Sequence, residues 1–404
     1  MANSQFTTRL IANVIFGVKR KELRNPKIKF LVFTGTVGKT TLRDAVVFGL
    51  KKQGYRVESN DLGYSNEVGV LLTTLGIERF SVINFRHWLK VLRAQINEEK
   101  FVCVELGADF YRDIPWFLRR FTPTAVFISG VSEEDWVVKA ENVTNDRKKL
   151  LDSVPKSGFI IYNIDDPPTK RLVERSNISA HKITFSLENQ DATLYAKSWS
   201  KNIFSLPLRE ALNKKELIEI IYSDRPYTIF SSKPLFEPQI YAIFAALSFI
   251  ATINGKRISE GIFDEYKFAP QRLQFSRAKN GAVILEDSYK ATPLCTFWFL
   301  KAAANTQAQK KILFITEMRP LTLNQNFFYE QLADLVRFAE KVYFLGPAEH
   351  WRQIASINKG FLHINVAEYS AVAKRVLQET DKNSLILLKG SFRYHLDYLK
   401  QLLS

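Results

Sequence analysis

The feature that most constrains the fold is the run FLVFTGTVGKTTLRDAV, from Phe30 to Val46. An apolar segment at 30–33 leads into a short loop at 35–41, and a helical pattern begins directly after this loop. Glycines allow backbone N–H groups to approach an anion, and the start of the helix adds the positive end of its dipole. This strand–loop–helix order predicts a phosphate-binding loop and therefore a nucleotide-binding protein.

Each residue of the loop has a type that suits a bound triphosphate. Lys39 is expected to reach the β- and γ-phosphates, and the Thr40 hydroxyl is expected to bind Mg²⁺. The full pattern G-x-x-x-x-G-K-[ST] requires a glycine where Phe33 stands, so this loop is a shortened variant. The alternative is a glycine turn with a chance lysine. The predicted nucleotide-binding residues are Gly35, Thr36, Gly38, Lys39, Thr40 and Thr41.

The net charge and the cysteine count limit the kinds of molecule that this chain can bind and the compartment in which it works. The 404 residues suffice for two or three domains, and 57 Lys+Arg against 41 Asp+Glu give a net charge of +16. Such a charge favours anionic partners, but the basic residues are spread along the chain and no nucleic-acid recognition motif accompanies them. We therefore expect a small-molecule or peptide precursor as substrate and no nucleic acid. Only two cysteines occur, so a disulfide framework is excluded and a reducing cytoplasm fits.

The N-terminal segment leaves two interpretations open. An apolar stretch at 10–18 is followed by Lys19, Arg20 and Lys21, which is the reverse of the charge order in a signal peptide. No apolar segment reaches the ~20 residues that a bilayer-spanning helix needs. The segment is either a helix that packs on the first domain or a basic amphipathic helix on the inner membrane leaflet. Residues 1–27 could thus place a cytoplasmic protein at the membrane surface.

The pattern along the chain predicts an α/β protein. Apolar runs at 30–33, 101–105, 125–128 and 159–163 are typical of buried parallel strands that alternate with helices. The runs between 182 and 232 indicate antiparallel strands that extend this sheet, and a helix is expected at 239–253. After a hinge at 267–274, a second α/β unit has strands at 283–286, 311–316, 341–345 and 384–388. The predicted division is an N-terminal segment 1–27, a central domain 28–268 and a C-terminal domain 269–404.

Seven stretches after the phosphate loop follow one family pattern in order. They are GYSNEVGVLLTTLG, VCVELGAD, PTAVFISGVSEEDW, VPKSGFIIYNIDDP, FAPQRLQF, ILEDSYKATP and LLKGSF. With TGTVGKTT, this series resembles the Mur ligase family, most closely its MurF type. The resemblance covers about residues 30–404 and implies a P-loop central domain followed by a Rossmann-like C-terminal domain. It also implies an ATP- and Mg²⁺-dependent ligase that forms an amide bond through an acyl phosphate, on a cell-wall peptide precursor or a related anionic carboxylate.

The resemblance assigns roles to residues outside the loop. It makes Glu105 a Mg²⁺ ligand beside Thr40, at the carboxyl end of a buried strand where open α/β sheets bind ligands. It places Asn66 near the substrate, although this asparagine could instead cap the helix that begins there. In the C-terminal half, it assigns nucleotide contacts to Arg272 and Asp287. It assigns contacts with the incoming amine to Lys389 and Ser391, and the alternative for all four is a surface charge or polar group.

Two departures from the family pattern concern the second metal. Asp135 stands where the family has a histidine ligand, and an aspartate can still bind Mg²⁺. The family's carbamylated lysine aligns with Arg147, which stays protonated. Either Lys148 or Lys149 takes this catalytic role after a small shift, or the second metal site is weakened. We expect Asp135 as a metal ligand and Lys148 as the shifted lysine.

Two further departures concern what is bound. Pro238 and Ala242 replace a histidine and the asparagine that reads adenine, and only about 28 residues precede the first strand, where the MurF type has a UDP-binding domain. These changes leave room for a second hypothesis, a Mur-like nucleotide-binding scaffold or regulator with weakened catalysis. A P-loop kinase or simple NTPase is a third, but it does not explain the C-terminal motifs.

Overall fold

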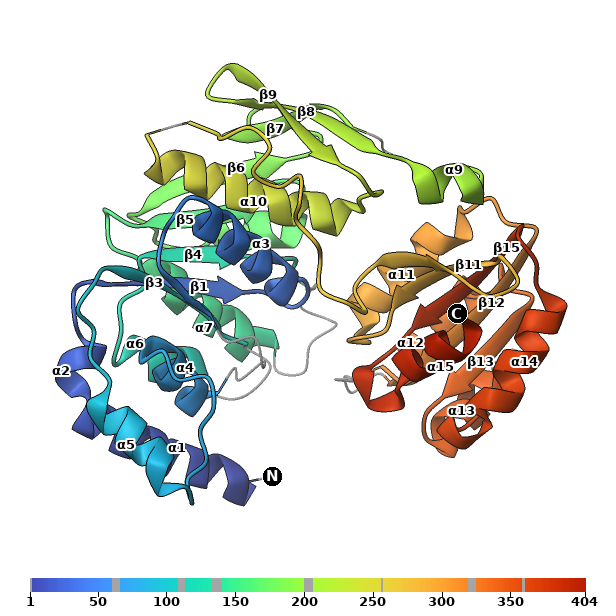
Figure 1. Cartoon of the computed structure of the whole chain (residues 1–404), viewed down its shortest axis with the longest axis horizontal. Helices are drawn as coiled ribbons and strands as arrows, with labels where there is room; N and C mark the ends of the chain where they lie inside the picture. Colours follow the sequence, from blue (N-terminus) through green and yellow to red (C-terminus); the bar gives the residue numbers. More distant parts are fainter. Residues whose placement is uncertain are drawn as a thin grey trace.

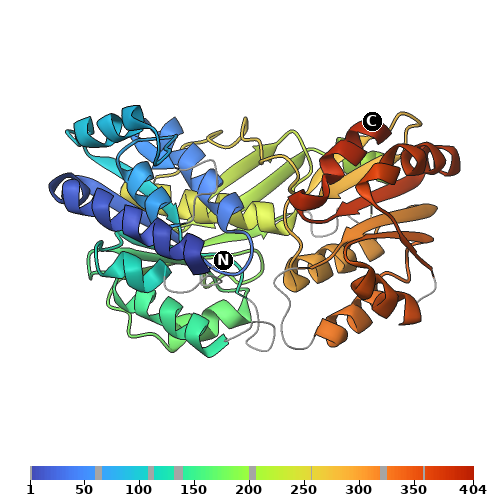
Figure 2. The ribbon, with the colours of Figure 1, turned by 90° about the horizontal axis from the view of Figure 1, so that it is seen from below.

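The chain forms two lobes, each built on one β-sheet with helices on both faces (Figures 1 and 2). The computed structural model describes residues 2–59, 66–107, 113–131, 140–199, 206–255, 257–318, 325–357 and 360–404. The predicted α/β class, with a P-loop sheet followed by a second α/β unit, is confirmed.

The N-terminal sheet has nine strands in the order β2-β3-β1-β4-β5-β6-β7-β8-β9. All neighbours from β2 to β7 pair in parallel, whereas β8 and β9 are antiparallel. The four predicted parallel strands are confirmed as β1, β3, β4 and β5. The strands are β1 (Ile28–Thr34), β2 (Val57–Ser59), β3 (Lys100–Glu105), β4 (Ala125–Ile128), β5 (Phe159–Asn163), β6 (His181–Ser186), β7 (Leu194–Ser198), β8 (Glu216–Tyr222) and β9 (Arg225–Ser231).

The prediction of antiparallel strands throughout 182–232 is wrong for β6, and for β7 it holds only for the pairing with β8. β6 continues the parallel run from β5, and β7 joins β6 in parallel through two residue pairs. Thr184 and Thr193 tie the two strands, because each backbone N–H donates to the other hydroxyl, at 3.1 and 2.8 Å. After β6 the chain therefore crosses back, so that β7 joins the sheet beside β6 and in the same direction. The alternation of apolar residues could not reveal this direction.

The sheet is buried on both faces because alternate side chains of β1 enter different cores. Leu31 and Phe33 pack with α3 and α10, whereas Phe30 and Val32 pack with the helices of the opposite face. The helix α10 is apolar all round and is buried along most of its length, as expected for a helix inside a large core. The helices of this lobe are α1 (Ala2–Val18), α2 (Arg20–Leu23), α3 (Lys39–Lys52), α4 (Glu67–Thr74), α5 (Phe85–Arg93), α6 (Asp113–Leu118), α7 (Ala140–Asp152), α8 (Pro167–Glu174) and α10 (Glu237–Ile253).

The C-terminal sheet has six strands in the order β10-β11-β15-β12-β13-β14. Among the described strands of this sheet, only β10 runs antiparallel, and the four predicted strands are confirmed as β11, β12, β13 and β15. The strands are β10 (Gln274–Arg277), β11 (Val283–Asp287), β12 (Lys310–Thr316), β13 (Lys341–Leu345), β14 (Phe361–His363) and β15 (Ser384–Lys389). The helices are α11 (Pro293–Ala304), α12 (Gln325–Leu335), α13 (Ala348–Ile357), α14 (Tyr369–Glu379) and α15 (Leu396–Leu403), with short 3₁₀ turns η3 (Val366–Glu368) and η4 (Phe392–Tyr394).

The helix α9 (Leu208–Asn213) links the two lobes. It lies between β7 and β8 of the N-terminal sheet in sequence, yet Leu208 and Ala211 belong to the apolar core of the C-terminal lobe. Figure 1 shows α9 reaching across to that lobe. The predicted boundary between residues 268 and 269 stays a prediction, but residues 208–213 pack on the C-terminal side of it.

The second connection is the predicted hinge. Between α10 and β10, Gln271 and Leu273 have positive φ angles of 62° and 48°. Such angles are uncommon for residues with a side chain, and they mark a sharp change of chain direction. Among the described helices, none is both long and apolar enough to cross a membrane.

Candidate active site

The phosphate loop is shaped by two glycines with positive φ. β1 ends at Thr34 and α3 begins at Lys39, with Gly38 as its N-terminal cap at φ 81°. Gly35 has φ 134°, and a Cβ there would lie 2.2 Å from the Ser129 Oγ atom, so no larger residue fits. The first N–H groups of α3 have no partner within the helix. They and the positive end of the helix dipole form the cradle that the sequence predicts.

Lys39 lies back over this loop. Its Nζ atom donates to the backbone oxygen of Gly35 at 2.6 Å. The loop itself is anchored by backbone N–H groups of Thr36 and Val37, which both donate to the Gly130 oxygen at 2.9 and 3.2 Å. The lysine ammonium is therefore held over the mouth of the cradle, where it can exchange a carbonyl oxygen for a phosphate oxygen.

Glu105 stands at the end of β3 and forms a network with α3. The Thr40 hydroxyl donates to its Oε2 atom at 3.2 Å, and Arg43 Nη1 pairs with its Oε1 atom at 2.9 Å. Arg43 also pairs with Asp44 at 2.6 Å. Burial by itself would lower the pKa of Arg43, but Glu105 and Asp44 raise it, so the guanidinium stays charged. Burial raises the pKa of Asp44.

The oxygen atoms of Thr40 and Glu105 are a donor pair that suits Mg²⁺. This ion prefers oxygen ligands and usually takes only one or two from the protein, with phosphates and water completing the octahedron. Among the described residues, no group of three or more His, Cys, Asp or Glu could hold a metal. Asp135, the predicted further ligand, lies outside the described residues.

A cavity of 580 Å³ opens in front of the loop and is lined by both lobes. The N-terminal lobe contributes all of residues 36–43 and Glu105, together with Pro238 and Ala242 of α10. The C-terminal lobe contributes Asp287, with Arg272 lining it from the hinge. The structure thus brings every predicted nucleotide residue except Gly35 to the lining of one cavity.

Arg272 and Asp287 are held by different means. The guanidinium of Arg272 stacks over the Tyr289 ring, 4.0 Å from its centre. Asp287 pairs with Lys389 Nζ at 2.5 Å. Burial by itself would lower the pKa of Lys389, but Asp287 and Cys295 raise it above its ordinary value. Lys389 is therefore a charged, fully buried group.

Comparison with known proteins agrees with this arrangement. Residues 33–220 match the family model for the Mur ligase middle domain. The UDP-N-acetylmuramoyl-tripeptide–D-alanyl-D-alanine ligase of Rickettsia prowazekii is 23% identical over 384 residues, which cover 92% of this chain and 77% of that protein. The enzyme of the same name from Buchnera aphidicola is 21% identical, over 91% of this chain and 75% of that protein. Residues 33–220 of this chain therefore form a Mur ligase middle domain.

Solved structures of Mur ligases share the fold. The MurF ligase of Thermotoga maritima, solved in complex with ADP, superposes with a TM-score of 0.72 at 17% identity, over 97% of this chain and 83% of that one. A pseudomurein peptide ligase type C from Methanothermus fervidus superposes with a TM-score of 0.66 at 13% identity, over 95% and 81%. The likeness extends across both lobes.

Three residues with predicted substrate contacts do not line the cavity in front of the phosphate loop, and those contacts stay predictions. Asn66 caps α4, because its side chain accepts a hydrogen bond from the Gly69 N–H at 2.8 Å, and it does not line the cavity. Lys389 does not line the cavity either, and it forms an ion pair with Asp287, which does. The backbone N–H of Ser391 donates to Thr316 Oγ1 at 3.1 Å, and Ser391 is also absent from the lining.

The helix α7 turns a different residue toward the loop than predicted. Arg147 is buried, and its Nη2 atom donates to Thr36 Oγ1 at 3.3 Å. Lys148 does not line the cavity, and Lys149 pairs with Asp146 on the same helix at 3.6 Å. The structure therefore brings Arg147 to the phosphate loop, where the shifted-lysine prediction had Lys148.

Two groups that the sequence did not single out also belong to the site. Arg43 is one, because it fixes the Glu105 carboxylate. Asp165 is the other: it accepts hydrogen bonds from Ser186 at 2.5 Å and from the Tyr241 hydroxyl at 3.0 Å, and both Asp165 and Tyr241 line the cavity. Asp165 lies in the NIDDP stretch, so its position at a strand end was a usable signal.

Proposed function

We propose that this Mur ligase joins a carboxylate of an anionic precursor to an amine, at the expense of ATP and by way of an acyl phosphate. One observation carries the proposal: the cavity contains the phosphate loop of one lobe and Arg272 and Asp287 from the other side. A simple nucleotidase would not need the second lobe. A ligase needs it, because nucleotide, acid and amine must meet in one water-poor cleft.

The described residues fit ATP and Mg²⁺. In this proposal, Lys39 moves its ammonium from the Gly35 oxygen to the phosphoryl group in transfer and stabilises its charge. Thr40 and Glu105 would hold Mg²⁺, and the ion would supply neutralisation of the phosphate charge. Arg43 is a positioning residue that orients the Glu105 carboxylate. Asp135 remains a proposed ligand for a further ion, and Arg272 and Asp287 remain proposed nucleotide contacts.

The reaction has two balanced steps. A carboxylate oxygen of the acceptor attacks the γ-phosphorus of ATP, and the bond to the ADP oxygen breaks. The amine then attacks the acyl carbon, loses a proton and expels inorganic phosphate. Both steps move negative charge between oxygens, so a lysine, a metal and backbone N–H groups suffice and no protein nucleophile is needed.

The substrates follow from the relatives at the level of class. Both curated relatives above are named for joining D-alanyl-D-alanine to a UDP-N-acetylmuramoyl-tripeptide. We infer that this chain acts on a cell-wall peptide precursor of this kind, in the cytoplasm, with residues 1–27 in contact with the inner membrane face. We further propose that the lobes, divided near residue 268, close on the substrates about the positive-φ residues Gln271 and Leu273.

The test is ADP release by purified chain supplied with ATP, Mg²⁺, UDP-N-acetylmuramoyl-tripeptide and D-alanyl-D-alanine. We expect release that requires both substrates. Lys39→Ala should slow it by about a hundredfold to a thousandfold, the scale of losing one donor to the developing charge. Lys52→Ala, at the far end of α3, is the matched control and should keep full activity. ADP release that ignores the substrates, or that survives Lys39→Ala, would overturn the proposal.

One observation favours a second candidate, a nucleotide-binding scaffold without turnover. Arg147, which cannot be carbamylated, is the residue of α7 that contacts the loop. Calorimetric titration with ATP separates the two. Tight, Lys39-dependent binding with no ADP release under any acid and amine would favour the scaffold.

A further inference from the structure

The side chains of helix α5 fall into three sectors around its circumference. At 3.6 residues per turn, Phe85, Leu89 and Leu92 share about 60° of its circumference. Arg86, Lys90 and Arg93 occupy the adjacent ~60°. The remaining sector faces the protein, where Val91 is buried. The helix therefore turns both an apolar and a cationic stripe outward.

The apolar stripe is continued by the segment before the helix. The relative exposure of Ile83 is 96% and that of Phe85 is 72%, and Val82 and Leu92 are also exposed. The segment is not loose, because the Trp88 indole donates to the Val82 oxygen at 2.8 Å and Asn84 caps the helix at the Arg86 N–H. Two large apolar side chains are thus held out from the surface by an ordered turn.

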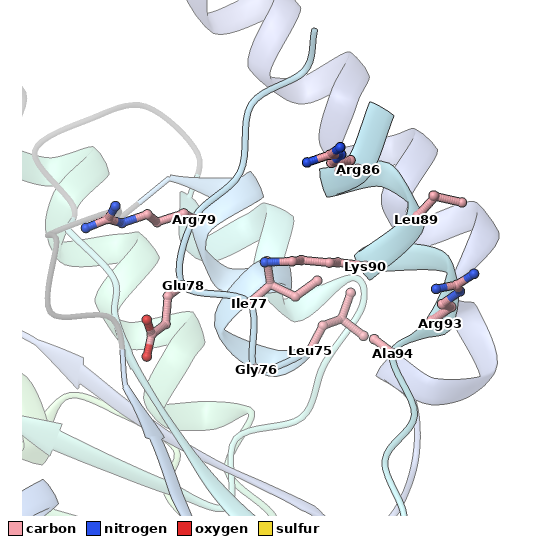
Figure 3. A pocket seen from close by; sticks show the side chains of 10 residues that line it. All are labelled: Leu75, Gly76, Ile77, Glu78, Arg79, Arg86, Leu89, Lys90, Arg93 and Ala94. Atoms are coloured by element: carbon pink, nitrogen blue, oxygen red, sulfur yellow. The ribbon is translucent and has the colours of Figure 1, made fainter. Parts of the chain in front are cut away.

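The cationic stripe borders a hollow between α4 and α5. The hollow has a volume of 720 Å³ and is lined by the turn from Leu75 to Arg79 and by Arg86, Lys90 and Arg93. Figure 3 shows the four cationic side chains around it, with Lys90 extended across the mouth above Ile77. Within the described part of the chain, none of the four forms an ion pair, and Glu78 is the single acidic residue of the lining.

The helix α1 lies beside α5 and adds a second apolar stripe (Figures 1 and 2). Leu10, Val14 and Val18 are four residues apart and exposed, while Ala12 and Ile15 on the other side are buried. The two helices are joined at one end, because Lys19 Nζ donates to the Leu92 oxygen at 2.9 Å. The two helices are therefore fixed to one another at this end.

We propose that this surface, made of the 82–93 segment with α1 at its side, docks on a bilayer that contains anionic phospholipids. Ile83, Phe85 and Leu92 enter the boundary between headgroups and acyl chains, and the four cations bind lipid phosphates. The proposal adds a second, cationic element to a contact through residues 1–27. It does not rest on the ligase activity, since no residue of the surface lines the ATP cavity.

The combination of groups decides between classes of partner. Nucleic acid and free polyanions would bind the cations but would leave Ile83 and Phe85 in water. A purely apolar protein groove would leave four unpaired cations at its border. A bilayer with anionic headgroups offers a partner to both stripes: lipid phosphates for the cations and, deeper in the bilayer, acyl chains for the apolar side chains.

The experiment is co-sedimentation of the full chain with phosphatidylcholine vesicles that contain 30% phosphatidylglycerol, against pure phosphatidylcholine. We expect binding to the anionic vesicles only, weakened by salt. The triple variant R86A/K90A/R93A should bind about a hundredfold more weakly, since each cation near such a surface contributes roughly a factor of five. I83S/F85S should also release the protein, because it removes the inserted groups without changing charge.

Matched variants remove the same chemistry elsewhere on the molecule. K156A/K170A/K182A takes three exposed lysines from other elements, and Leu217→Ser takes an exposed leucine from β8. Both should bind vesicles as the unaltered chain does. The proposal is overturned if the chain stays in the supernatant, if the α5 variants bind like the controls, or if I83S/F85S has no effect while R86A/K90A/R93A does. That last result would identify a general polyanion site.

Discussion

The two walls of the cavity in front of the phosphate loop are built by opposite means. The N-terminal wall is mostly backbone: two positive-φ glycines, the first N–H groups of α3 and a lysine resting on its own loop. The C-terminal wall is made of side chains, with Arg272 stacked on Tyr289 and Asp287 paired with a fully buried lysine. The backbone wall is ready for any anion of the right size, whereas the side-chain wall depends on charges that the protein must hold in place.

This difference teaches where the molecule is vulnerable. A backbone cradle fails when its shape is altered, so it should lose affinity while the fold survives. A wall made of a buried ion pair fails when one charge is removed, so it should lose stability first. The predictions that follow test this contrast, beginning with the largest effect.

Asp287→Asn should destabilise the C-terminal lobe by about 3 kcal/mol, because it leaves the Lys389 ammonium buried without its counter-charge. Urea unfolding measures this loss. Glu265→Gln is the matched control, since its pair with Lys52 is exposed at both ends and should matter little. Equal stability of the two variants would contradict a structural role for the buried pair.

The same variant should change the pH dependence of stability. In the unaltered chain the pKa of Lys389 is raised, so its contribution is complete below the unfolded-state value and is lost only as the pH rises through the higher folded-state value. In Asp287→Asn, burial lowers the pKa, so the folded chain binds fewer protons than the unfolded chain. The free energy of unfolding should then rise from pH 7 towards pH ~10. Urea unfolding curves of both proteins across this pH range give the sign of the pH dependence. If the free energy of unfolding changes with pH in the same way in both proteins, the prediction is contradicted.

Gly35→Ala should weaken nucleotide binding by about a hundredfold while the fold persists. The added Cβ would meet Ser129 Oγ at 2.2 Å and would also strain a backbone at φ 134°, so the cradle must change shape. Gly54→Ala shares a positive φ, of 81°, but its Cβ would meet nothing within 4 Å. We expect that control to lose some stability and no affinity. Unchanged affinity in Gly35→Ala would show that nucleotide does not bind at this loop.

Arg272→Ala should raise the KM for ATP about tenfold and leave stability nearly unchanged, because the side chain rests on the Tyr289 ring at the cavity wall. Arg277→Ala, on the exposed side of β10, is the control. Steady-state kinetics distinguish them. Identical KM values in the two variants would remove Arg272 from the nucleotide site.

Asn66→Ala should cost about 1 kcal/mol of stability through the lost cap of α4. Asn66→Asp keeps a side-chain oxygen at the same place and should restore it. If Asn66 instead binds substrate, as the family pattern suggests, Asn66→Asp should remain impaired in KM for the acceptor. Thermal unfolding together with acceptor titration separates the two roles.

The sequence predicted the N-terminal wall well and the C-terminal wall only in outline. A glycine loop between a strand and a helix dictates its own geometry, so the positions of Lys39, Thr40 and Glu105 followed from local order. The position of Lys389 did not follow in this way. The family pattern predicted that this lysine contacts the substrate, whereas its side chain turns inward to Asp287. That pairing joins residues 102 positions apart and leaves no local trace.

Other differences have the same physical cause. The parallel pairing of β6 with β7 depends on a turn held by Thr184 and Thr193. The place of α9 on the C-terminal core depends on contacts between lobes. Each of these features depends on tertiary contacts, which the periodicity of apolar residues in the sequence does not predict. Arg147, by contrast, reaches the loop from the position that the family pattern gives to its modified lysine, and the shift to Lys148 was inferred only from the chemistry of arginine, not from the rotation of α7.

The central claim is that a nucleoside triphosphate and Mg²⁺ bind at the start of α3, between Lys39 and Glu105. Calorimetric titration of a non-hydrolysable ATP analogue tests it most directly, with and without Mg²⁺, in the unaltered chain and in Lys39→Ala and Glu105→Gln. We predict saturable binding of one analogue per chain, a loss of about a hundredfold in Lys39→Ala, and a Mg²⁺ dependence that disappears in Glu105→Gln. Absence of binding, or equal affinity in all three proteins, would contradict it.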